Sequence, residues 1–252
     1  MNVQKVTVNC EKHGDYEANQ MDIYGKAITT TKCPKCAVEH LEETKRKERE
    51  ASEFAKKIRI ETSVNNFERC IPARFKHATL ENYVADTPQK QEKLKAFERY
   101  SAAFGNKIQE TGGGLILTGN PGTGKTHLSI GLGRELASVG WHVAYVNLTN
   151  LIRRIRSTWT DETQSEDEII RRLQDLNLLI IDEVGAQTGS DNERNIIFEI
   201  VNGRYEQVKP TIIISNYSVK EVADFISERS VDRITQGGAV LNFTWESYRG
   251  AA

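Results

Sequence analysis

The chain has 252 residues, with 34 Lys and Arg against 35 Asp and Glu, so its formal net charge is -1. This balance excludes a protein drawn to nucleic acid or lipid by its overall charge. No apolar run reaches the roughly 18 residues of a membrane span, and the N-terminus lacks the apolar stretch of a secretory signal. Four cysteines are too few for a disulfide scaffold. We therefore expect a cytoplasmic protein without a membrane partner, whose thiols are reduced or bound to metal.

Residues 1–40 hold three of the four cysteines, in two short ligand pairs, and few residues for an apolar core. The pairs are Cys10-x-x-His13 and Cys33-x-x-Cys36. Structural Zn²⁺ takes four tetrahedral sulfur or nitrogen ligands, and a segment without a core needs such a crosslink. We predict a zinc-binding N-terminal domain over residues 1–40, with His40 as a competitor of His13. The other interpretation is free cysteines beside a surface histidine.

Residues 41–66 open with a charged run that contains neither Gly nor Pro. Three acidic residues precede a basic residue by four positions, which is the favourable order on a helix. These pairs are Glu42–Arg46, Glu43–Lys47 and Glu53–Lys57. No large apolar residue stands between Leu41 and Phe54, so a coiled-coil seam is excluded. The pattern predicts a solvated helical linker over 41–66.

From residue 67 to residue 252 the chain alternates helical patterns with short apolar runs. The runs typical of buried strands are 115–119, 142–148, 178–182 and 211–215. This alternation predicts a three-layer α/β domain with a mainly parallel sheet. Ser165-x-x-Glu168 and Ser218-x-x-Glu221 are both typical of capping boxes that open helices.

The segment GNPGTGKT, Gly119–Thr126, fits the phosphate-loop pattern and stands between a strand and a helix. Its glycines let the loop curl until backbone N–H groups face inward, toward phosphate oxygens at the positive end of the helix. Lys125 is placed to reach the β- and γ-phosphates, and Thr126 offers a hydroxyl to Mg²⁺. The predicted nucleotide contacts are Gly119, Asn120, Pro121, Gly122, Thr123, Gly124, Lys125, Thr126 and His127.

A hydrolytic nucleotide site needs a carboxylate at the end of a neighbouring strand, and LLIIDE supplies two candidates. Asp182 ends the apolar run and is predicted to hold Mg²⁺, while Glu183 is predicted to polarise the attacking water. Asn216, at the end of the next strand, would sit between the two motifs and position that water relative to the γ-phosphate. The alternatives are a strand-end cap for Asp182, a surface carboxylate for Glu183 and a turn residue for Asn216.

In this order the motifs resemble the AAA+ class of P-loop ATPases. Four flanking segments narrow the resemblance: LENYVADTPQKQEKLKAFERY, DEVGAQT, SERSVDRI and the closing NFTWESYR. Together they are similar to bacterial replicative helicase loaders of the DnaC type, over about residues 67–250. The closing WESYR is specific among P-loop proteins.

This resemblance implies a five-stranded AAA+ core that uses ATP as a switch to load a ring helicase onto single-stranded DNA. It implies that Asn216 is the first sensor, that Arg233 acts in trans on a neighbour's γ-phosphate, and that Arg249 senses nucleotide in cis. Positive charge at the transferred phosphoryl group accelerates hydrolysis, so activity would require self-assembly. Arg229 is near enough to exchange roles with Arg233, and a structural salt bridge is the other interpretation of each arginine. The predicted catalytic residues are Lys125, Asp182, Glu183, Asn216, Arg233 and Arg249.

The N-terminal segment departs from the DnaC type, whose N-terminus is helical and lacks these cysteines. It is more similar to loaders that carry a zinc-binding N-terminal domain, or to phage-encoded relatives. In the family this region docks on the helicase. A nucleic-acid-binding zinc knuckle is the rival interpretation.

Residues 151–159, LIRRIRSTW, place an apolar face beside several arginines and a tryptophan. Guanidinium groups and an aromatic ring suit the phosphates and unstacked bases of single-stranded DNA. We predict contacts from Arg153, Arg156 and Trp159, with weak, salt-sensitive binding that is independent of sequence. The alternative is an amphipathic helix with a solvated basic face.

We therefore predict a cytoplasmic ATPase that binds ATP, Mg²⁺ and Zn²⁺, assembles with itself, and places a replicative helicase on single-stranded DNA. One alternative is a transposition helper ATPase that acts on duplex DNA. Another is a zinc-based adaptor whose nucleotide site scarcely turns over.

Overall fold

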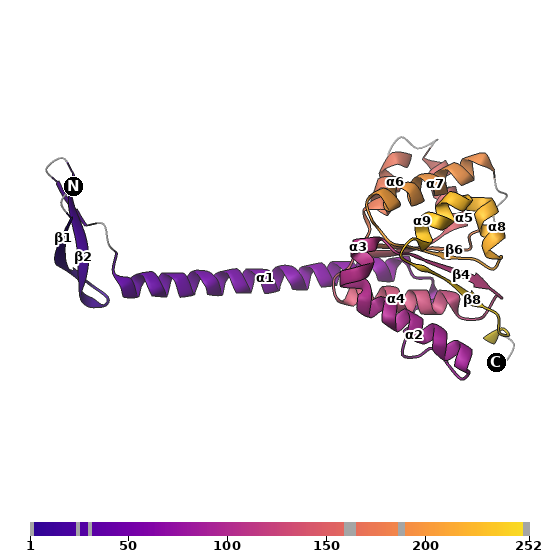
Figure 1. Ribbon diagram of the computed structural model, residues 1–252, viewed down its shortest axis with the longest axis horizontal. Helices are drawn as coiled ribbons and strands as arrows, with labels where there is room; N and C mark the ends of the chain where they lie inside the picture. Colours follow the sequence, from indigo (N-terminus) through magenta and orange to yellow (C-terminus); the bar gives the residue numbers. More distant parts are fainter. Residues whose placement is uncertain (1–2, 24–25, 30–31, 159–164, 186–189, 249–252) are drawn as a thin grey trace. The chain divides into compact units, whose positions relative to one another are not determined.

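The structure is a computed structural model that describes residues 3–23, 26–29, 32–158, 165–185 and 190–248 (Figure 1). The chain divides into two compact units, Met1–Ile58 and Arg59–Ala252. The domain boundaries expected at residues 40 and 66 stay predictions. The described helices include none that is both long and apolar enough to cross a lipid bilayer.

The N-terminal unit contains an antiparallel sheet, which the sequence analysis did not predict. Its strands are β1 (Val3–Cys10), β2 (Gly14–Ile23) and β3 (Lys26–Thr29), in that order across the sheet. Val6, Val8 and Cys10 are partly buried and alternate with exposed residues along β1, which is the period of a half-covered strand. Ala18 of β2 is buried. The sheet gives the unit a scaffold, and its first hairpin carries two of the predicted zinc ligands.

The charged segment is helical, as expected, but the helix is longer than predicted. α1 spans Pro34–Cys70. Its first residue is a proline, which costs little in a first turn because those N–H groups have no partner inside the helix. The ion pair of Glu43 and Lys47 forms at 2.7 Å. Within the second unit, Ser63 and Phe67 are buried, so the last turns of α1 belong to its core.

The second unit is built on five parallel strands in the order β5-β6-β7-β4-β8. The strands are β4 (Leu115–Gly119), β5 (Val143–Asn147), β6 (Leu178–Asp182), β7 (Thr211–Ile214) and β8 (Ala239–Phe243). The first four match the predicted apolar runs, and β8 is the fifth strand that the resemblance implied. The expected three-layer α/β fold is confirmed. Because β7 lies between β4 and β6, the phosphate-loop and the acidic strand end flank it at one edge of the sheet.

Alternation along the strands divides the core between the two faces of the sheet. Leu178 and Ile180 pack with the cluster on one face, and Leu179 and Ile181 with the cluster on the other. The first face is covered by α2 (Pro88–Ala103), α4 (Lys125–Ser138) and the end of α1, with short turns η1 (Ala73–Phe75), η2 (Phe104–Ile108) and α3 (Gln109–Thr111). The opposite face carries α5 (Leu148–Ser157), α6 (Glu166–Asp175), α7 (Asp191–Glu206), α8 (Val219–Ile226) and α9 (Glu228–Thr235) (Figure 1).

The predicted capping boxes had different outcomes. Ser218 and Glu221 form the expected reciprocal box at the start of α8. Ser165 is the N-cap of α6, but its side chain makes no cap hydrogen bond, so the box predicted there is wrong. A box that was not predicted opens α7, where Ser190 and Glu193 cap each other. The spacing marks the start of both helices correctly, but of these two predicted boxes only the one at α8 closes.

Candidate nucleotide-binding site and metal centre

The phosphate-loop connects β4 to the N-terminus of α4, as its sequence pattern requires. Gly119, Gly122 and Gly124 have φ of 112°, 75° and 93°, a region that L side chains rarely adopt. All three are also closely approached by other parts of the chain, and a Cβ at Gly119 would lie 2.2 Å from the carbonyl oxygen of Phe243. A Cβ at Gly122 would lie 2.0 Å from Ser247 Oγ, and one at Gly124 would lie 2.5 Å from Tyr83 Cε2. The loop is therefore held in its curled shape by both backbone conformation and packing.

Lys125 is buried and lies in the loop itself. Its Nζ donates to the carbonyl oxygens of Gly119 at 2.8 Å and of Asn120 at 2.7 Å. These contacts hold the ammonium group inside the curve of the loop, where the phosphates of a nucleotide would lie. Carbonyl groups of the loop thus help to hold the ammonium group in this position.

The acidic strand end meets the loop through direct hydrogen bonds. Thr126 Oγ1 and Tyr145 OH each donate to Asp182 Oδ2 at 2.8 Å. Burial raises the pKa of Asp182, against the lowering effect of these two hydrogen bonds. A hydroxyl and a carboxylate that share one position are the oxygen ligands that Mg²⁺ prefers. The predicted pair of Mg²⁺ ligands, Thr126 and Asp182, therefore fits the ion.

Glu183 follows Asp182 with an exposed side chain and a left-handed backbone, at φ 61°. Such a conformation is uncommon for a residue with a Cβ and is found at functional turns. Its backbone N–H donates to Asp182 Oδ1 at 2.8 Å, and Asn147 Nδ2 donates to its Oε2 at 2.5 Å. Asn147 was not among the predicted site residues, although it ends β5 and so lies at the same edge of the sheet. Asn216 comes just after β7 at this edge, and its side chain is exposed.

The C-terminal segment after β8 packs directly on the phosphate-loop. Asn120 Nδ2 donates to the carbonyl oxygen of Thr244 at 3.0 Å. Trp245 Nε1 and Tyr83 OH both donate to the carbonyl oxygen of Thr123, each at 3.2 Å. Tyr83 and Trp245 fall in the LENYV and WESYR segments, which were predicted only to mark the family. Their spatial role is to support the loop from outside.

His127, also predicted to contact nucleotide, lies at the side of the loop. Its Nε2 is 2.9 Å from the carbonyl oxygen of Thr79, and its ring meets the Tyr83 ring edge-on at 5.6 Å between centroids. Its role in nucleotide binding stays a prediction.

The predicted arginines have different environments. Arg233, on α9, lies over the ring of Tyr205 on α7, 4.9 Å from its centroid. Arg229, one turn earlier, is exposed.

The predicted DNA contacts on α5 also differ. Arg153 is exposed, whereas Arg156 forms an ion pair with the buried Glu193 at 3.1 Å. Arg249 and Trp159 lie outside the described residues.

The four predicted zinc ligands come together in the N-terminal unit. Cys10 ends β1, His13 lies in the hairpin turn, Cys33 precedes α1, and Cys36 lies in its first turn. Their ligand atoms all lie within 4.8 Å of one another. His13 Nδ1 is 3.3 to 3.9 Å from the three sulfurs, and Cys10 Sγ is 3.5 Å from Cys36 Sγ. A tetrahedral zinc with sulfurs at about 2.3 Å separates its ligands by roughly 3.8 Å, so the cluster fits the ion.

Glu39 orients the histidine of this cluster. It accepts a hydrogen bond from His13 Nε2, with 2.9 Å between His13 Nε2 and Glu39 Oε1. The hydrogen bond from Lys12 lowers the pKa of Glu39, followed by the bond to His13, so the group is a carboxylate. A proton held on Nε2 leaves Nδ1 free to bind a metal, which is the usual role of such a carboxylate. The cluster contains His13, and His40, its possible competitor, lies exposed on α1.

Comparison with known proteins identifies the family. A family model described as IstB-like ATP binding protein matches residues 26–251. The replicative helicase loader DnaC of Escherichia coli (strain K12) is 30% identical over 174 residues, covering 69% of this chain and 69% of that protein. The loader DnaC of Buchnera aphidicola subsp. Schizaphis graminum (strain Sg) is 32% identical over 177 residues, covering 69% of this chain and 70% of that protein.

Solved structures agree with this fold. The crystal structure of the DnaC helicase loader matches with a TM-score of 0.60 and 25% identity, over 68% of this chain and 99% of that chain. DnaA bound to AMPPCP and single-stranded DNA matches with a TM-score of 0.57 and 23% identity, over 69% of this chain and 51% of that chain, and this likeness concerns the fold alone. The resemblance stated from the sequence is confirmed: the chain belongs to the IstB-like ATP-binding proteins and to the family of the replicative helicase loader DnaC.

Proposed function

We propose that this protein is an ATP-dependent loader that places a replicative helicase on single-stranded DNA, with ATP binding and hydrolysis acting as a switch. The observation that carries the proposal is the hydrogen bond between Thr126 and Asp182, which joins the two nucleotide motifs in a chain related to DnaC. Both groups would hold Mg²⁺, which when bound neutralises charge on the phosphate oxygens. The named relatives support the helicase as partner.

The remaining groups of the site have separable roles in hydrolysis. Lys125 would bind the β- and γ-phosphates from its position inside the loop. Glu183, held by Asn147, would accept a proton from the attacking water. Asn216 would help to orient that water. Because none of these groups supplies positive charge from outside the loop, slow turnover by a single chain is expected.

Self-assembly would complete the site. We assign Arg233 as the arginine that reaches a neighbour's γ-phosphate, since a second positive group there accelerates phosphoryl transfer strongly. We assign Arg249 a role in cis, because it is the next residue after Tyr248 in the sequence. The backbone N–H of Tyr248 donates to the carbonyl oxygen of Gly122, in the phosphate-loop of the same chain, at 3.0 Å. Loss of the γ-phosphate would release both arginines and loosen the assembly.

Single-stranded DNA would contact α5 of the assembled protein. Arg153 is exposed there and is the strongest of the predicted contacts. Arg156 would contribute less, because its charge is already paired with Glu193. Electrostatic binding of this kind weakens steeply with salt and does not depend on base sequence.

We also propose that the N-terminal unit holds one structural Zn²⁺ through Cys10, His13, Cys33 and Cys36. The support is their mutual spacing and the carboxylate behind His13. Four protein ligands leave no open position, so this zinc would order the unit and take no part in hydrolysis. Such a unit would serve as the docking element for the helicase.

The test is a loading assay with the host's replicative helicase and a circular single-stranded DNA. The native protein should increase helicase bound to the circle in the presence of ATP, and Lys125→Ala should not. The Glu183→Gln variant should bind nucleotide but stay bound to the helicase, because without hydrolysis the switch cannot reset. If the native protein neither associates with the helicase nor changes its loading, the proposal is wrong.

Comparison of ATPase rates with single-stranded and duplex DNA tests the two alternatives. Stronger stimulation by duplex DNA would favour the transposition helper. Single-turnover hydrolysis that is unchanged in Glu183→Gln, with DNA and helicase present, would favour the adaptor with little turnover.

A further inference from the structure

A row of three side chains on α7 holds the guanidinium group of Arg233. Phe198, Asn202 and Tyr205 follow one another by four and three positions, so they share one face of the helix. Arg233 Cζ lies 4.9 Å from the ring centroid of Tyr205 and 5.9 Å from that of Phe198. Its Nη1 donates to Asn202 Oδ1. We call these three residues the α7 cradle.

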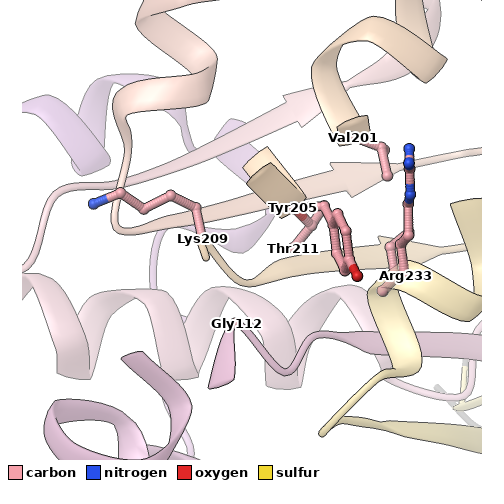
Figure 2. Close-up of a pocket in the computed structure, with 7 residues that line it drawn as sticks. Gly112, Val201, Tyr205, Lys209, Thr211 and Arg233 are labelled. Carbon is pink, nitrogen blue, oxygen red and sulfur yellow. The ribbon is translucent and has the colours of Figure 1, made fainter. Parts of the chain in front are cut away.

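The cradle residues are themselves oriented by their neighbours. Asn202 Nδ2 donates to Glu206 Oε1 at 2.8 Å, which turns the amide oxygen toward Arg233. Tyr205 OH donates to Gln236 Oε1 at 2.9 Å, which fixes the ring beneath the guanidinium. Figure 2 shows the Arg233 side chain lying alongside Tyr205 and Val201. The contact is therefore a built arrangement between α7 and α9.

The chemistry of the cradle separates Arg233 from the paired arginines of this chain. Arg134, Arg156 and Arg172 each form an ion pair with a glutamate. Within the described ranges, Arg233 has no such carboxylate; its partners are two aromatic faces and an amide. Ring faces attract a cation without neutralising it, and they leave the N–H groups at the edge of the guanidinium available. The cradle thus fixes the position of Arg233 while preserving its charge.

The cavity beside this contact has about 10 Å³, the space of about one water molecule. It is lined by residues of α7 and α9, by the first residue of β7 and by residues that precede β4 and β7, among them Tyr205 and Arg233 (Figure 2).

We infer that Phe198, Asn202 and Tyr205 are positioning residues that hold Arg233 ready for the nucleotide of a neighbouring subunit. This rests on the trans role of Arg233 in the proposed function. Holding a reacting group in place lowers the entropy cost of the reaction, and small misplacements cost as much as 10²-fold in rate. The cradle would act on turnover and not on nucleotide affinity, because it lies on the arginine-donating subunit.

The test compares Tyr205→Leu with Tyr205→Phe in the full chain, by ATPase assay with single-stranded DNA at concentrations where the native protein assembles. We expect Tyr205→Leu to lower kcat about tenfold, with KM for ATP unchanged. Tyr205→Phe keeps the ring and should retain most of the activity. Lys209→Ala is the matched control, because Lys209 lines the same cavity and points away from Arg233 (Figure 2).

Mixed assemblies distinguish positioning from general damage. Lys125→Ala chains cannot hold a triphosphate but still carry a native Arg233 and cradle. Adding them to Tyr205→Leu chains should restore hydrolysis several-fold, as it should for Arg233→Ala chains. Native activity in Tyr205→Leu, or a loss that Lys125→Ala cannot restore while Arg233→Ala is restored, would overturn the inference. Faster turnover would also overturn it, since the cradle would then withhold Arg233. Failure to restore Arg233→Ala itself would instead refute the trans role on which the inference depends.

Discussion

Thr126 Oγ1 donates to Asp182 Oδ2 at 2.8 Å, across 56 residues of sequence, and so joins the phosphate-loop to the acidic strand end. The bond places two oxygen ligands at one position beside the buried Lys125. Asp182 accepts this bond as a buried side chain. Because burial is expensive for a carboxylate, this residue is expected to reduce stability in order to serve nucleotide binding.

The first prediction concerns the free-energy cost of burying the Asp182 carboxylate in the nucleotide-free protein. Burial raises the pKa of Asp182, so its contribution to stability is full below the unfolded pKa and is lost as pH rises through the folded pKa. Asp182→Asn should therefore raise the Tm near pH 7.5 and abolish ATPase activity. The gain in Tm should shrink as pH is lowered toward 4.5. Calorimetry at the two pH values checks this, and a lower Tm at pH 7.5 would contradict it.

The second prediction concerns Arg204, which is completely buried. It donates to the carbonyl oxygens of Leu173, Leu176 and Pro210 and to Thr211 Oγ1. Arg204→Met would leave buried carbonyl groups without donors, each at roughly 1–3 kcal/mol, so we expect a loss of about 3 kcal/mol or more. Urea denaturation measures it. Arg153→Met, on an exposed arginine, is the control and should change stability little.

The third prediction concerns support of the phosphate-loop by Tyr83 and Trp245. Both donate to the carbonyl oxygen of Thr123, so Tyr83→Phe alone leaves that oxygen with one donor. Each hydrogen bond contributes about 1 kcal/mol, and Tyr83→Phe should weaken nucleotide binding up to about fivefold. Adding Trp245→Phe removes the second donor, and the double variant should lose more than the product of the single losses. Titration with a fluorescent ATP analogue tests this, and independent effects would contradict the shared role.

The fourth prediction concerns the Cys/His cluster. Metal analysis of the purified protein should find one zinc per chain, and Cys36→Ser should reduce this content sharply, because a structural site needs all four ligands. Cys70→Ser is the matched control, since Cys70 lies on α1 outside the cluster.

Chelation should then increase hydrogen exchange in β1 and β2, because metal binding is coupled to folding in small units. Exchange in β4 and β6, which have an apolar core of their own, should not change. If hydrogen exchange in β1 and β2 were the same before and after chelation, a structural role for the metal would be contradicted.

The local parts of this protein could be predicted from its amino-acid sequence. The phosphate-loop, the acidic strand end and the four parallel runs were predictable, because their backbone needs are expressed over a few neighbouring residues. The two ligand pairs were predictable for the same reason. The N-terminal sheet was missed because most residues of its strands are polar, and the short alternation of Val6, Val8 and Cys10 did not stand out without their cross-strand partners.

How these parts meet could not be predicted before the chain was seen folded. The placement of β7 between β4 and β6 sets which side chains share the edge of the sheet, and no local pattern encodes strand order. The pairing of Arg156 with Glu193, the support of Thr123 by Trp245 and the cradle beneath Arg233 each join distant segments. Such contacts depend on packing between whole elements, so they become visible only when the chain is folded.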